Sequence, residues 1–462
     1  MSDYRIEKDS MGEVNVPSHA LWGAQTQRAV ENFPISGRPM PPRVIHAFGR
    51  VKGGAALVNK EKGSLEPHVA DAVIQAAREV AEGKLDGHFP VDVYQTGSGT
   101  SSNMNANEVI ANRAIQILGG VLGSKSPVHP NDHVNMGQSS NDVVPTVIHL
   151  AALQAIEHDL LPALRHLGDA LEEKARAFDP IVKIGRTHLQ DAVPVRLGQE
   201  FSGYAQQVRN GIRRVEGAKP ALCELALGGT AVGTGLNAAP GFSEAVIAHL
   251  ARETGLPLRQ APNLFEALAA QDAVVEASGA LRTVAVSLTK IAEDIRWLGS
   301  GPRCGLGELV IPDLQPGSSI MPGKVNPVMS EMMVMVCAQV LGNDLTVAVA
   351  GQGGHFELNT MLPVMAANLL DSVSILAAAC RTFADRCVRG LAADEARCEE
   401  MVERSLAMVT ALAPVIGYDA AAALAKEAHA SGRTIRELCE EKNILPKEQL
   451  KRLLDARAMT GE

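Results

Sequence analysis

The segment LRTVAVSLTKIAEDIRWL, residues 281–298, decides the fold class. Its large apolar residues recur at alternating spacings of three and four without a slip: Leu281, Val284, Leu288, Ile291, Ile295 and Leu298. This spacing is typical of a helix that buries one seam along its whole length. The segment therefore predicts a long core helix and a mainly α-helical protein.

Two further segments carry the same spacing. The first contains Leu153, Ile156, Leu160, Leu164, Leu167 and Leu171, and the second contains Leu197, Phe201, Tyr204, Val208, Ile212 and Val215. We expect Pro162 to bend the first helix, because proline cannot donate a hydrogen bond inside it. Helices of about 30 residues would span about 45 Å. Helices of this length are longer than a compact domain, so we expect a helical bundle that other subunits complete. An elongated monomeric bundle is the alternative.

Composition supports a helical core and excludes several classes of protein. Of 462 residues, 46% are hydrophobic and only 3% aromatic, so the core is built from aliphatic side chains that suit closely packed helices. The 43 basic and 52 acidic side chains give a formal net charge of −9, which argues against a nucleic-acid or membrane-surface binder. The apolar content excludes intrinsic disorder.

Cysteine usage and the chain's start predict a cytoplasmic location. The seven cysteines include no C-x-x-C pair, so we interpret them as reduced core thiols and not as a disulfide frame or a zinc site. Residues 1–7 form neither a signal core nor a transit peptide. No run approaches the roughly 18 consecutive apolar residues of a membrane helix.

Changes along the chain in helical pattern, loop content and charge predict three regions. Residues 1–138 mix short helical stretches with polar loops, residues 139–393 are dominated by long helical patterns, and residues 394–462 form a short, charged helical section. We therefore expect an N-terminal domain of mixed short elements, a central bundle domain and a small C-terminal helical domain.

Four polar segments, three of which contain glycine, lie at or shortly before the N-termini of predicted helices: residues 96–103, 138–142, 185–188 and 317–327. Helix N-termini offer free N–H groups and the positive end of the helix dipole. With their Ser, Thr and Asn side chains and one lysine, these segments suit a small polyanion, whether a carboxylate or a phosphate.

Each segment also has a simpler interpretation. Serine and asparagine before a helix are most often only caps. Gly323-Lys324 is followed by valine, so a Walker phosphate-binding loop is excluded. His129 and His133 flank a Pro-Asn-Asp turn, which favours a surface loop over a metal site. From the residues alone, the prediction stops at a helical enzyme with anion sites at helix ends.

Residues 317–327, Gly-Ser-Ser-Ile-Met-Pro-Gly-Lys-Val-Asn-Pro, take the prediction further. They resemble the signature of the fumarase/aspartase superfamily, and residues 185–192, 96–105, 138–142 and 227–236 resemble its other blocks. The resemblance covers nearly the whole chain. The stretches that are most similar to class II fumarases are residues 261–263, 265–268, 294–298, 300–303, 356–359, 416–419 and 425–426.

The resemblance implies a three-domain, mainly α fumarase/aspartase-like fold. It also implies a homotetramer whose long helices form a shared bundle, with each active site assembled from three subunits. The implied activity is reversible anti addition of water to fumarate to give L-malate, a step of the tricarboxylic acid cycle. This chemistry would need a small dicarboxylate substrate and neither a metal nor an organic cofactor.

The same resemblance assigns five catalytic residues. Ser318 matches the base that takes the carbon-bound proton, and we expect Lys324 and loop N–H groups to stabilise its oxyanion. His188 matches the acid that handles the hydroxyl or water, and Glu331 matches its carboxylate partner. Lys324 and Asn326 would hold the negative charge that develops on the substrate carboxylate.

The remaining positions that match the family bind substrate or form a secondary site. Residues expected to hold the substrate are Ser98, Gly99, Thr100, Ser139, Ser140, Asn141, Thr187, Ser319, Lys324, Val325 and Asn326. The stretch His129, Pro130, Asn131 and Asp132 resembles the family's secondary carboxylate site, although Lys125-Ser126 stands where some relatives carry arginine.

Two alternatives to fumarate hydration remain open. Val328-Met329-Ser330 is locally similar to aspartases, which release ammonia by the same kind of proton abstraction, whereas residues 353–359 favour fumarase. An aspartate ammonia-lyase, or a lyase for a larger succinyl adduct, is therefore the main alternative. A non-catalytic scaffold like some eye-lens proteins is the other, and the complete set of catalytic residues argues against it.

Overall fold

The computed structural model describes residues 3–461, which form two compact units. Unit 1 comprises the chain up to residue 161 together with residues 213–283 and 339–376. Unit 2 comprises residues 162–212, 284–338 and 377 onward. The predicted division at residues 138 and 393 stays a proposal.

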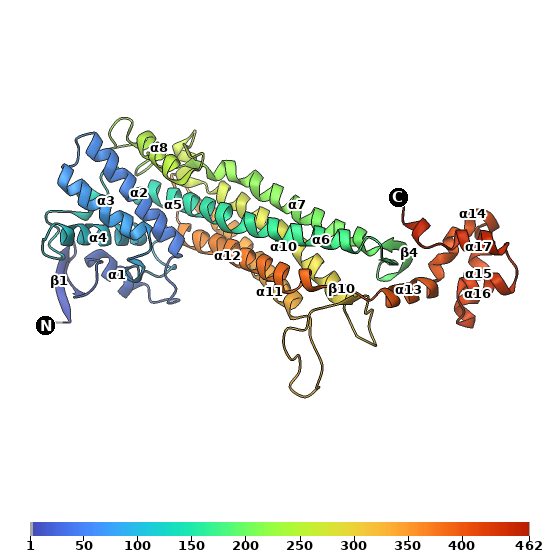
Figure 1. The fold of residues 1–462 in the computed structure, drawn as a ribbon. Helices are drawn as coiled ribbons and strands as arrows, with labels where there is room; N and C mark the ends of the chain where they lie inside the picture. The colour runs from blue at the N-terminus through green and yellow to red at the C-terminus, as the bar shows by residue number, and fades with distance from the viewer. Residues whose placement is uncertain (1–2, 462) are drawn as a thin grey trace. The chain divides into compact units, whose positions relative to one another are not determined.

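Unit 1 opens with an antiparallel hairpin of β1 (Tyr4–Asp9) and β2 (Gly12–Pro17), in which Tyr4 pairs with Pro17. Its helices include α1 (Ala24–Asn32), α2 (Pro42–Glu61), α3 (Pro67–Ala81), α4 (Thr100–Ile117), α5 (Ser140–Ala155), α8 (Phe242–Thr254) and α9 (Leu264–Ala269). Figure 1 shows α2, α3 and α4 lying close together. Two short strand pairs, β5 (Glu224–Leu225) with β6 (Arg259–Gln260) and β8 (Gly354–His355) with β9 (Leu358–Asn359), complete it.

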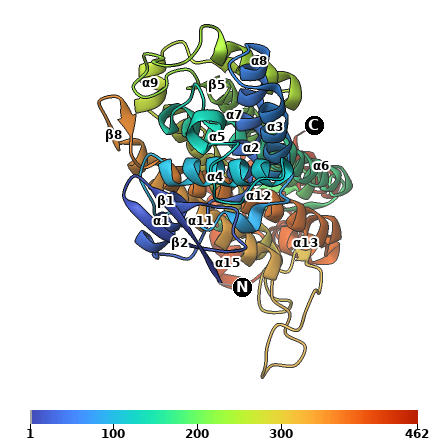
Figure 2. The same cartoon turned by 90° about the vertical axis from the view of Figure 1, so that its left-hand side faces the viewer.

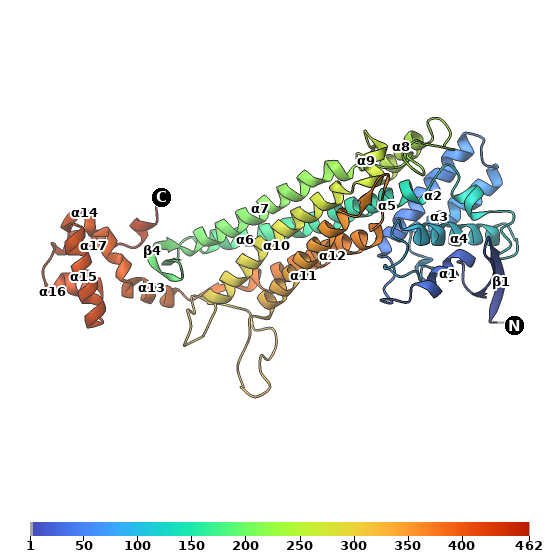
Figure 3. The same cartoon turned by 180° about the vertical axis from the view of Figure 1, so that it is seen from behind.

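Unit 2 contains α6 (Leu161–Ala177) and a hairpin of β3 (Val182–Thr187) and β4 (Gln190–Arg196). Figure 3 shows α10 (Asp272–Leu298), α11 (Val328–Gly351) and α12 (Leu362–Arg386) side by side. These three helices and α7 (Leu197–Leu222) contribute residues to both units. Strand β7 (Leu309–Val310) pairs with β10 (Ala392–Ala393), and the C-terminal helices are α13 (Glu395–Arg404), α14 (Ala413–Ile416), α15 (Tyr418–Ser431), α16 (Ile435–Glu441) and α17 (Lys447–Leu453).

The long helices predicted from apolar spacing are confirmed. The seam residues of α10, from Leu281 to Leu298, are all buried. The first predicted helix is interrupted, because α5 passes into a π-helical turn at Ile156–Leu160 before α6 begins. Pro162 is the second residue of α6, one residue beyond that turn. Ala155 and Leu161 on either side of the turn keep right-handed helical angles, and the expected bend at Pro162 stays a prediction.

Small residues allow the close helix packing expected from the composition. Figure 2 shows α2 beside α3. A Cβ atom added to Gly49 of α2 would lie 2.5 Å from the backbone nitrogen of Ala81 and 2.7 Å from the carbonyl oxygen of Ala77. Glycine is therefore required at residue 49 for the two helix backbones to approach this closely.

The structure differs from the sequence predictions at two hairpins and one thiol. The β1–β2 and β3–β4 hairpins were not predicted, because neither has the usual apolar alternation. Strand β1 buries Glu7 and exposes Ile6, and β3 buries Lys183, Ile184 and Gly185 in a row, with a bulge at Gly185. All seven cysteines are free, as expected, but Cys304 is exposed and is not a core thiol.

Helix α11 exposes an apolar surface. Its exposed large side chains include Met335, Leu341, Leu345 and Val349. By length and composition α11 and the segment Leu362–Gly390 could each cross a membrane, although core helices of soluble proteins pass the same test. Of the most apolar 18-residue stretch of α11, only 33% is buried within a single chain, so one chain leaves most of this surface uncovered.

Candidate active site

The first candidate segment of unit 1 forms the N-terminus of α4. Gly99 adopts a left-handed conformation with φ of 72°, and the hydroxyls of Ser98 and Thr100 lie 2.8 Å apart in a hydrogen bond. A Cβ atom on Gly97 would lie 1.8 Å from the carbonyl oxygen of Thr360. Only glycine at residue 97 lets the chain before α12 lie against this loop.

The second segment forms the N-terminus of α5. Ser139 caps the helix, and its own N–H donates to Asp142 Oδ1 at 2.9 Å in a capping box. Ser140 Oγ accepts a hydrogen bond from Asn103 Nδ2 of α4 at 3.0 Å, and Asn141 Nδ2 donates to the carbonyl oxygen of Ala231 at 2.8 Å. Thus Asn103 joins the two N-termini, and the structure brings both segments into one cluster.

A cavity opens beside this cluster. It has a volume of about 340 Å³ and is lined by Asn135, Gly137, Gln138, Ser139, Ser140, Thr230, Ala231, Leu236 and Asn237. The Asp142 carboxyl group, buried below it, also accepts the N–H groups of Gly228 and Thr230 at 3.0 Å each. Burial raises the pKa of Asp142, while these N–H donors oppose the rise.

Thr230 is strained where it lines the cavity. Its φ of 51° is rare for a β-branched residue, and its buried hydroxyl has no hydrogen-bond partner within the described residues. Such strain gathers at functional sites, so Thr230 is a candidate substrate contact that the sequence did not single out. The glycine turn of residues 227–236, noted in the sequence, is the segment that carries it.

In unit 2, Thr187 and His188 stand at the tip of the β3–β4 hairpin. His188 and Leu189 both have positive φ, at 56° and 58°, and Thr187 and His188 are exposed. The strand behind them is anchored by Arg186, which makes two hydrogen bonds to the buried Glu308 at 2.8 and 3.0 Å. The fully buried Lys183 lies 3.4 Å from Glu308 and 2.9 Å from Glu200.

The Ser318 segment is a loop that closes on itself. The N–H of Gly317 donates to the carbonyl oxygen of Lys324 at 2.8 Å, and Asn326 Nδ2 donates back to the carbonyl oxygen of Gly317 at 2.8 Å. Ser318 Oγ accepts the N–H groups of Ile320 at 3.3 Å and Met321 at 2.9 Å. Figure 1 shows the chain between α10 and α11 projecting from the helix ends of unit 2.

The ammonium group of Lys324 does not donate to Ser318 Oγ. Its Nζ donates to Asn326 Oδ1 at 2.8 Å, so in this structure backbone N–H groups alone donate to Ser318 Oγ. Of the other loop residues, Ser319, Lys324 and Val325 are exposed. The expected help of Lys324 to Ser318 therefore stays a prediction for the substrate-bound state.

Glu331 lies in the first turn of α11, where its N–H donates to the carbonyl oxygen of Pro327 at 3.1 Å. Within the described chain, its carboxylate makes no hydrogen bond or ion pair with His188. The expected pairing of Glu331 with His188 is thus not made in the single chain and stays a proposal for the assembled enzyme.

The predicted secondary site is a π-helical turn, Pro130–Val134, in unit 1. His129 Nδ1 accepts the N–H groups of Asn131 and Asp132 at 3.2 Å each, and His133 Nδ1 accepts the N–H of His129 at 2.9 Å. Because each ring already uses one nitrogen to fix the turn, the arrangement favours the loop interpretation over a metal site. Across residues 3–461, no group of three or more His, Cys, Asp and Glu could hold a metal ion.

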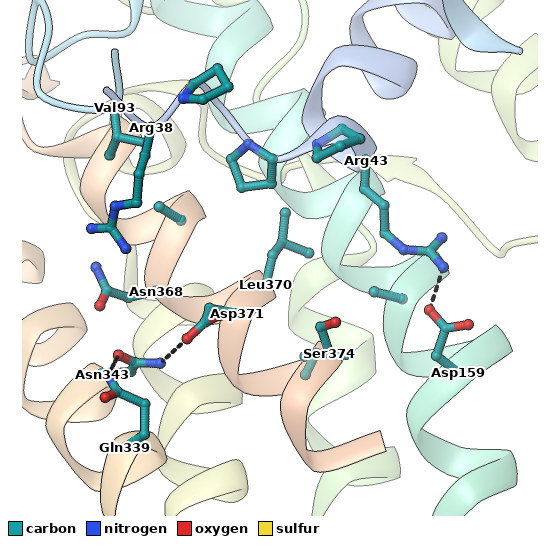
Figure 4. A pocket seen from close by; sticks show the side chains of 16 residues that line it. Arg38, Arg43, Val93, Asp159, Gln339, Asn343, Asn368, Leu370, Asp371 and Ser374 are labelled. Carbon is teal, nitrogen blue, oxygen red and sulfur yellow. Dashed lines mark hydrogen bonds and ion pairs between the residues drawn. The ribbon is translucent and has the colours of Figure 1, made fainter. Parts of the chain in front are cut away.

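Figure 4 shows a different cavity of unit 1, of about 530 Å³, lined by residues of α2, α5, α11 and α12 among others. Its polar side chains are largely paired with one another, since Asn343 Nδ2 donates to Asp371 at 2.9 Å and Arg43 forms an ion pair with Asp159. None of the predicted site residues lines it. It is therefore not the candidate active site.

Known proteins are similar to this chain in sequence and in fold. A lyase family model matches residues 12–342, and a model of the fumarase C C-terminus matches residues 408–461. The mitochondrial fumarate hydratase of Saccharomyces cerevisiae is 56% identical over 97% of this chain and 92% of its own length. The class II fumarate hydratase of Rhizobium meliloti is 57% identical over 95% and 94% of the two chains.

The chain belongs to the class II fumarase family.

A solved structure agrees with this assignment. The class II fumarase of Schistosoma mansoni superposes on this fumarase-family chain with a TM-score of 0.96, 42% identity and 99% coverage of each chain. The mainly α fumarase-like fold expected from the sequence is thereby confirmed.

Sequence reasoning gave no role to several buried polar residues near the candidate segments. Asn103 lies inside the quoted segment 96–103 but was assigned nothing, and Asn135 and Glu308 lie outside every quoted segment. One missed residue did leave a signal: Lys52 lies four residues after Phe48 and four before Ala56, on the apolar face of α2. A lysine at a core position of a helix is unusual enough to mark a buried polar site.

Proposed function

We propose that this chain catalyses the reversible hydration of fumarate to L-malate, as a hydro-lyase that uses acid and base side chains. The observation that carries the proposal is the Ser318 loop, in which two backbone N–H groups point at the serine hydroxyl. A serine is a poor base unless its oxyanion is stabilised, and such a pair of donors supplies that stabilisation. The full-length likeness to fumarate hydratases supports the same reaction.

In the direction of dehydration, Ser318 takes the proton from the carbon beside one carboxylate of malate. Negative charge then develops on that carboxylate, and Lys324 and Asn326 are proposed to hold it. The hydrogen bond from Lys324 Nζ to Asn326 Oδ1, at 2.8 Å, supports a joint role because it keeps the two side chains together. His188 protonates the departing hydroxyl, and Glu331 of another chain pairs with His188 and raises the basicity of its imidazole ring. General acid and base groups each contribute roughly 10²–10⁴-fold to such a reaction.

The N-termini of α4 and α5 supply the rest of the substrate site. Free N–H groups and hydroxyls at helix N-termini suit the two negative ends of a four-carbon dicarboxylate. The residues proposed to bind it are Ser98, Gly99, Thr100, Ser139, Ser140, Asn141, Thr187, Ser319, Lys324, Val325 and Asn326. The turn from His129 to Asp132 is proposed as a secondary carboxylate site.

The enzyme is proposed to be a homotetramer with active sites shared by three subunits. The exposed apolar surface of α11 supports association, because large apolar patches are rarely left in water. Its helix also carries Glu331, Asn343 and Asp344, which suit contact with protein better than with lipid. Other copies of the chain then cover α11 and bring His188, Ser318 and the α5 N-terminus into one site.

The assay that tests the reaction uses the ultraviolet absorbance of the conjugated double bond of fumarate. Purified protein is given L-malate in one cuvette and L-aspartate in another. We expect absorbance to rise with malate alone. A rise with aspartate alone would replace water by ammonia and make Val328–Ser330 the specificity segment. No rise with either would contradict fumarate hydration and favour a lyase for a larger succinyl adduct or a non-catalytic scaffold.

We propose a cytoplasmic location. The relatives include mitochondrial and bacterial enzymes, so family membership leaves the compartment open. Seven free cysteines, six of them buried, support a reducing compartment. Activity measured in fractions of the source cell tests this, and activity confined to a membrane or an oxidising compartment would contradict it.

A further inference from the structure

Unit 1 holds a lysine that the mechanism does not use. Lys52 lies in the middle of α2 and is fully buried, with 0% exposure. Its Nζ donates a hydrogen bond to Asn135 Oδ1 at 2.7 Å. Lysine is almost never fully buried unless its charge is matched, so this position needs an explanation.

Asn135 is the hub between Lys52 and the N-terminus of α5. Its Oδ1 also accepts Asn107 Nδ2 at 3.2 Å and Asn103 Nδ2 at 3.3 Å, and its own Nδ2 donates to the carbonyl oxygen of Gln138 at 3.1 Å. Gln138 is the residue directly before the proposed substrate segment, residues 139–141. Asn103 Nδ2 in turn reaches Ser140 Oγ at 3.0 Å.

The substrate segment is therefore held by two buried charged side chains. The ammonium group of Lys52 acts on it through Asn135 and Gln138, and the carboxyl group of Asp142 accepts the N–H of Ser139 and joins it to the glycine turn. Each charge favours the ionised form of the other. Buried side-chain oxygens of Asn103, Asn107 and Gln138 have no hydrogen-bond partner in the described structure, so acceptors beside Asn135 and the α5 N-terminus are left without a donor.

We propose that Lys52 is a positioning residue for substrate binding, which fixes residues 138–141 through Asn135 and adds positive charge behind the dicarboxylate site. This inference rests on the proposed function of that segment. A hydrogen bond from a charged donor contributes roughly 1.5–3 kcal/mol, so losing it is expected to weaken substrate binding about 10–100-fold. Because Lys52 does not touch the reacting atoms, kcat is expected to change much less than KM.

The test compares Lys52→Met with Lys52→Gln, which keeps an N–H donor without the charge, and with Lys60→Met as a control. Lys60 lies on the same helix but in a surface ion pair with Asp71. We expect Lys52→Met to raise KM for fumarate and the inhibition constant of succinate by at least about tenfold, with an intermediate effect for Lys52→Gln and none for Lys60→Met. Succinate cannot react, so its inhibition constant reports binding alone.

An unchanged KM and inhibition constant in a folded Lys52→Met enzyme would overturn the proposal. Turnover of malate by the wild-type enzyme is measured first, because its absence would overturn the proposed function instead. A fall in kcat at wild-type KM would likewise exclude a positioning role in binding.

A second measurement applies if Lys52→Met does not fold. Burial lowers the pKa of Lys52 to about 7, against the opposing effect of Asp142. The other groups bonded around it, from α4 and the turn at residue 135, are neutral amides, and His133 of that turn is engaged with the N–H of His129. On α8, which packs on α2, His249 faces Gly54 and pairs with Glu253. Succinate binding by His188→Asn, in which His188 cannot titrate, is therefore expected to weaken as pH rises from about 6 to about 8.5. Binding that is flat over this range would overturn the proposal.

Discussion

At the scale of single residues, the proposed chemistry depends on how Ser318 is held. Its hydroxyl accepts two backbone N–H groups in a loop that Gly317 and Asn326 close. The motif singled out Ser318 as the proposed base, but the arrangement of donors around it depends on backbone conformation, which the sequence does not show. For the same reason, the sequence did not predict that Lys324 donates its hydrogen bond to Asn326 and not to Ser318.

The substitutions Ser318→Ala and His188→Asn should each lower kcat by at least about 10²-fold, since each removes a general acid or base. Both side chains lie at loops outside the core, so the oligomeric state and the melting temperature should be unchanged. Initial rates with malate, light scattering and thermal unfolding measure kcat, the oligomeric state and the melting temperature. A rate near that of the wild type in either variant would remove that residue from the mechanism.

Lys52 also makes a prediction about stability and pH. Its native pKa of about 7 lies below the ordinary lysine value of about 10.4, so between these values the unfolded chain binds a proton that the native chain does not. The contribution of Lys52 to stability should therefore rise with pH across this window, by up to about 1.4 kcal/mol per pH unit. Urea unfolding at several pH values, compared with Lys52→Met, measures it, and parallel curves for the two proteins would refute it.

At the scale of elements, apolar spacing predicted the long helices but not the hairpins. The seam of α10 is an uninterrupted pattern of threes and fours, and such a pattern has one structural solution. The β3–β4 hairpin has no comparable signature, because it is bulged at Gly185 and held by Arg186 and Lys183 through Glu308, a residue distant in sequence. Long-range ion pairs of this kind cannot be deduced from local pattern.

The substitution Glu308→Ala tests that anchor. It would leave the buried Lys183 and the largely buried Arg186 without this carboxylate, and breaking a buried ion pair on one side costs about 3–5 kcal/mol. Thermal unfolding should show the loss, whereas Glu399→Ala, an exposed change on α13, should not. Equal melting temperatures for the two variants would mean that the Glu308 cluster does not stabilise the hairpin.

At the scale of the whole molecule, the surface of α11 predicts association. Met335 and Leu345 are each 66% exposed, which is costly for large apolar side chains in water. The double substitution Met335→Glu with Leu345→Glu should dissociate the enzyme and abolish turnover, while Met11→Glu, at a 79% exposed site in the turn between β1 and β2, should not. Light scattering distinguishes about four times the 48.8 kDa chain mass from smaller species. A double variant that keeps the wild-type mass would exclude α11 from the interface.

The central claim is that one reaction needs His188 and Ser318 from different copies of the chain, and subunit mixing tests it most directly. Ser318→Ala and His188→Asn chains, each inactive alone, are co-expressed with different tags and purified as mixed tetramers. If each site takes the two residues from different subunits, random mixing leaves about a quarter of the sites intact, so about a quarter of the wild-type activity should return. Mixed tetramers as inactive as either parent would contradict shared active sites.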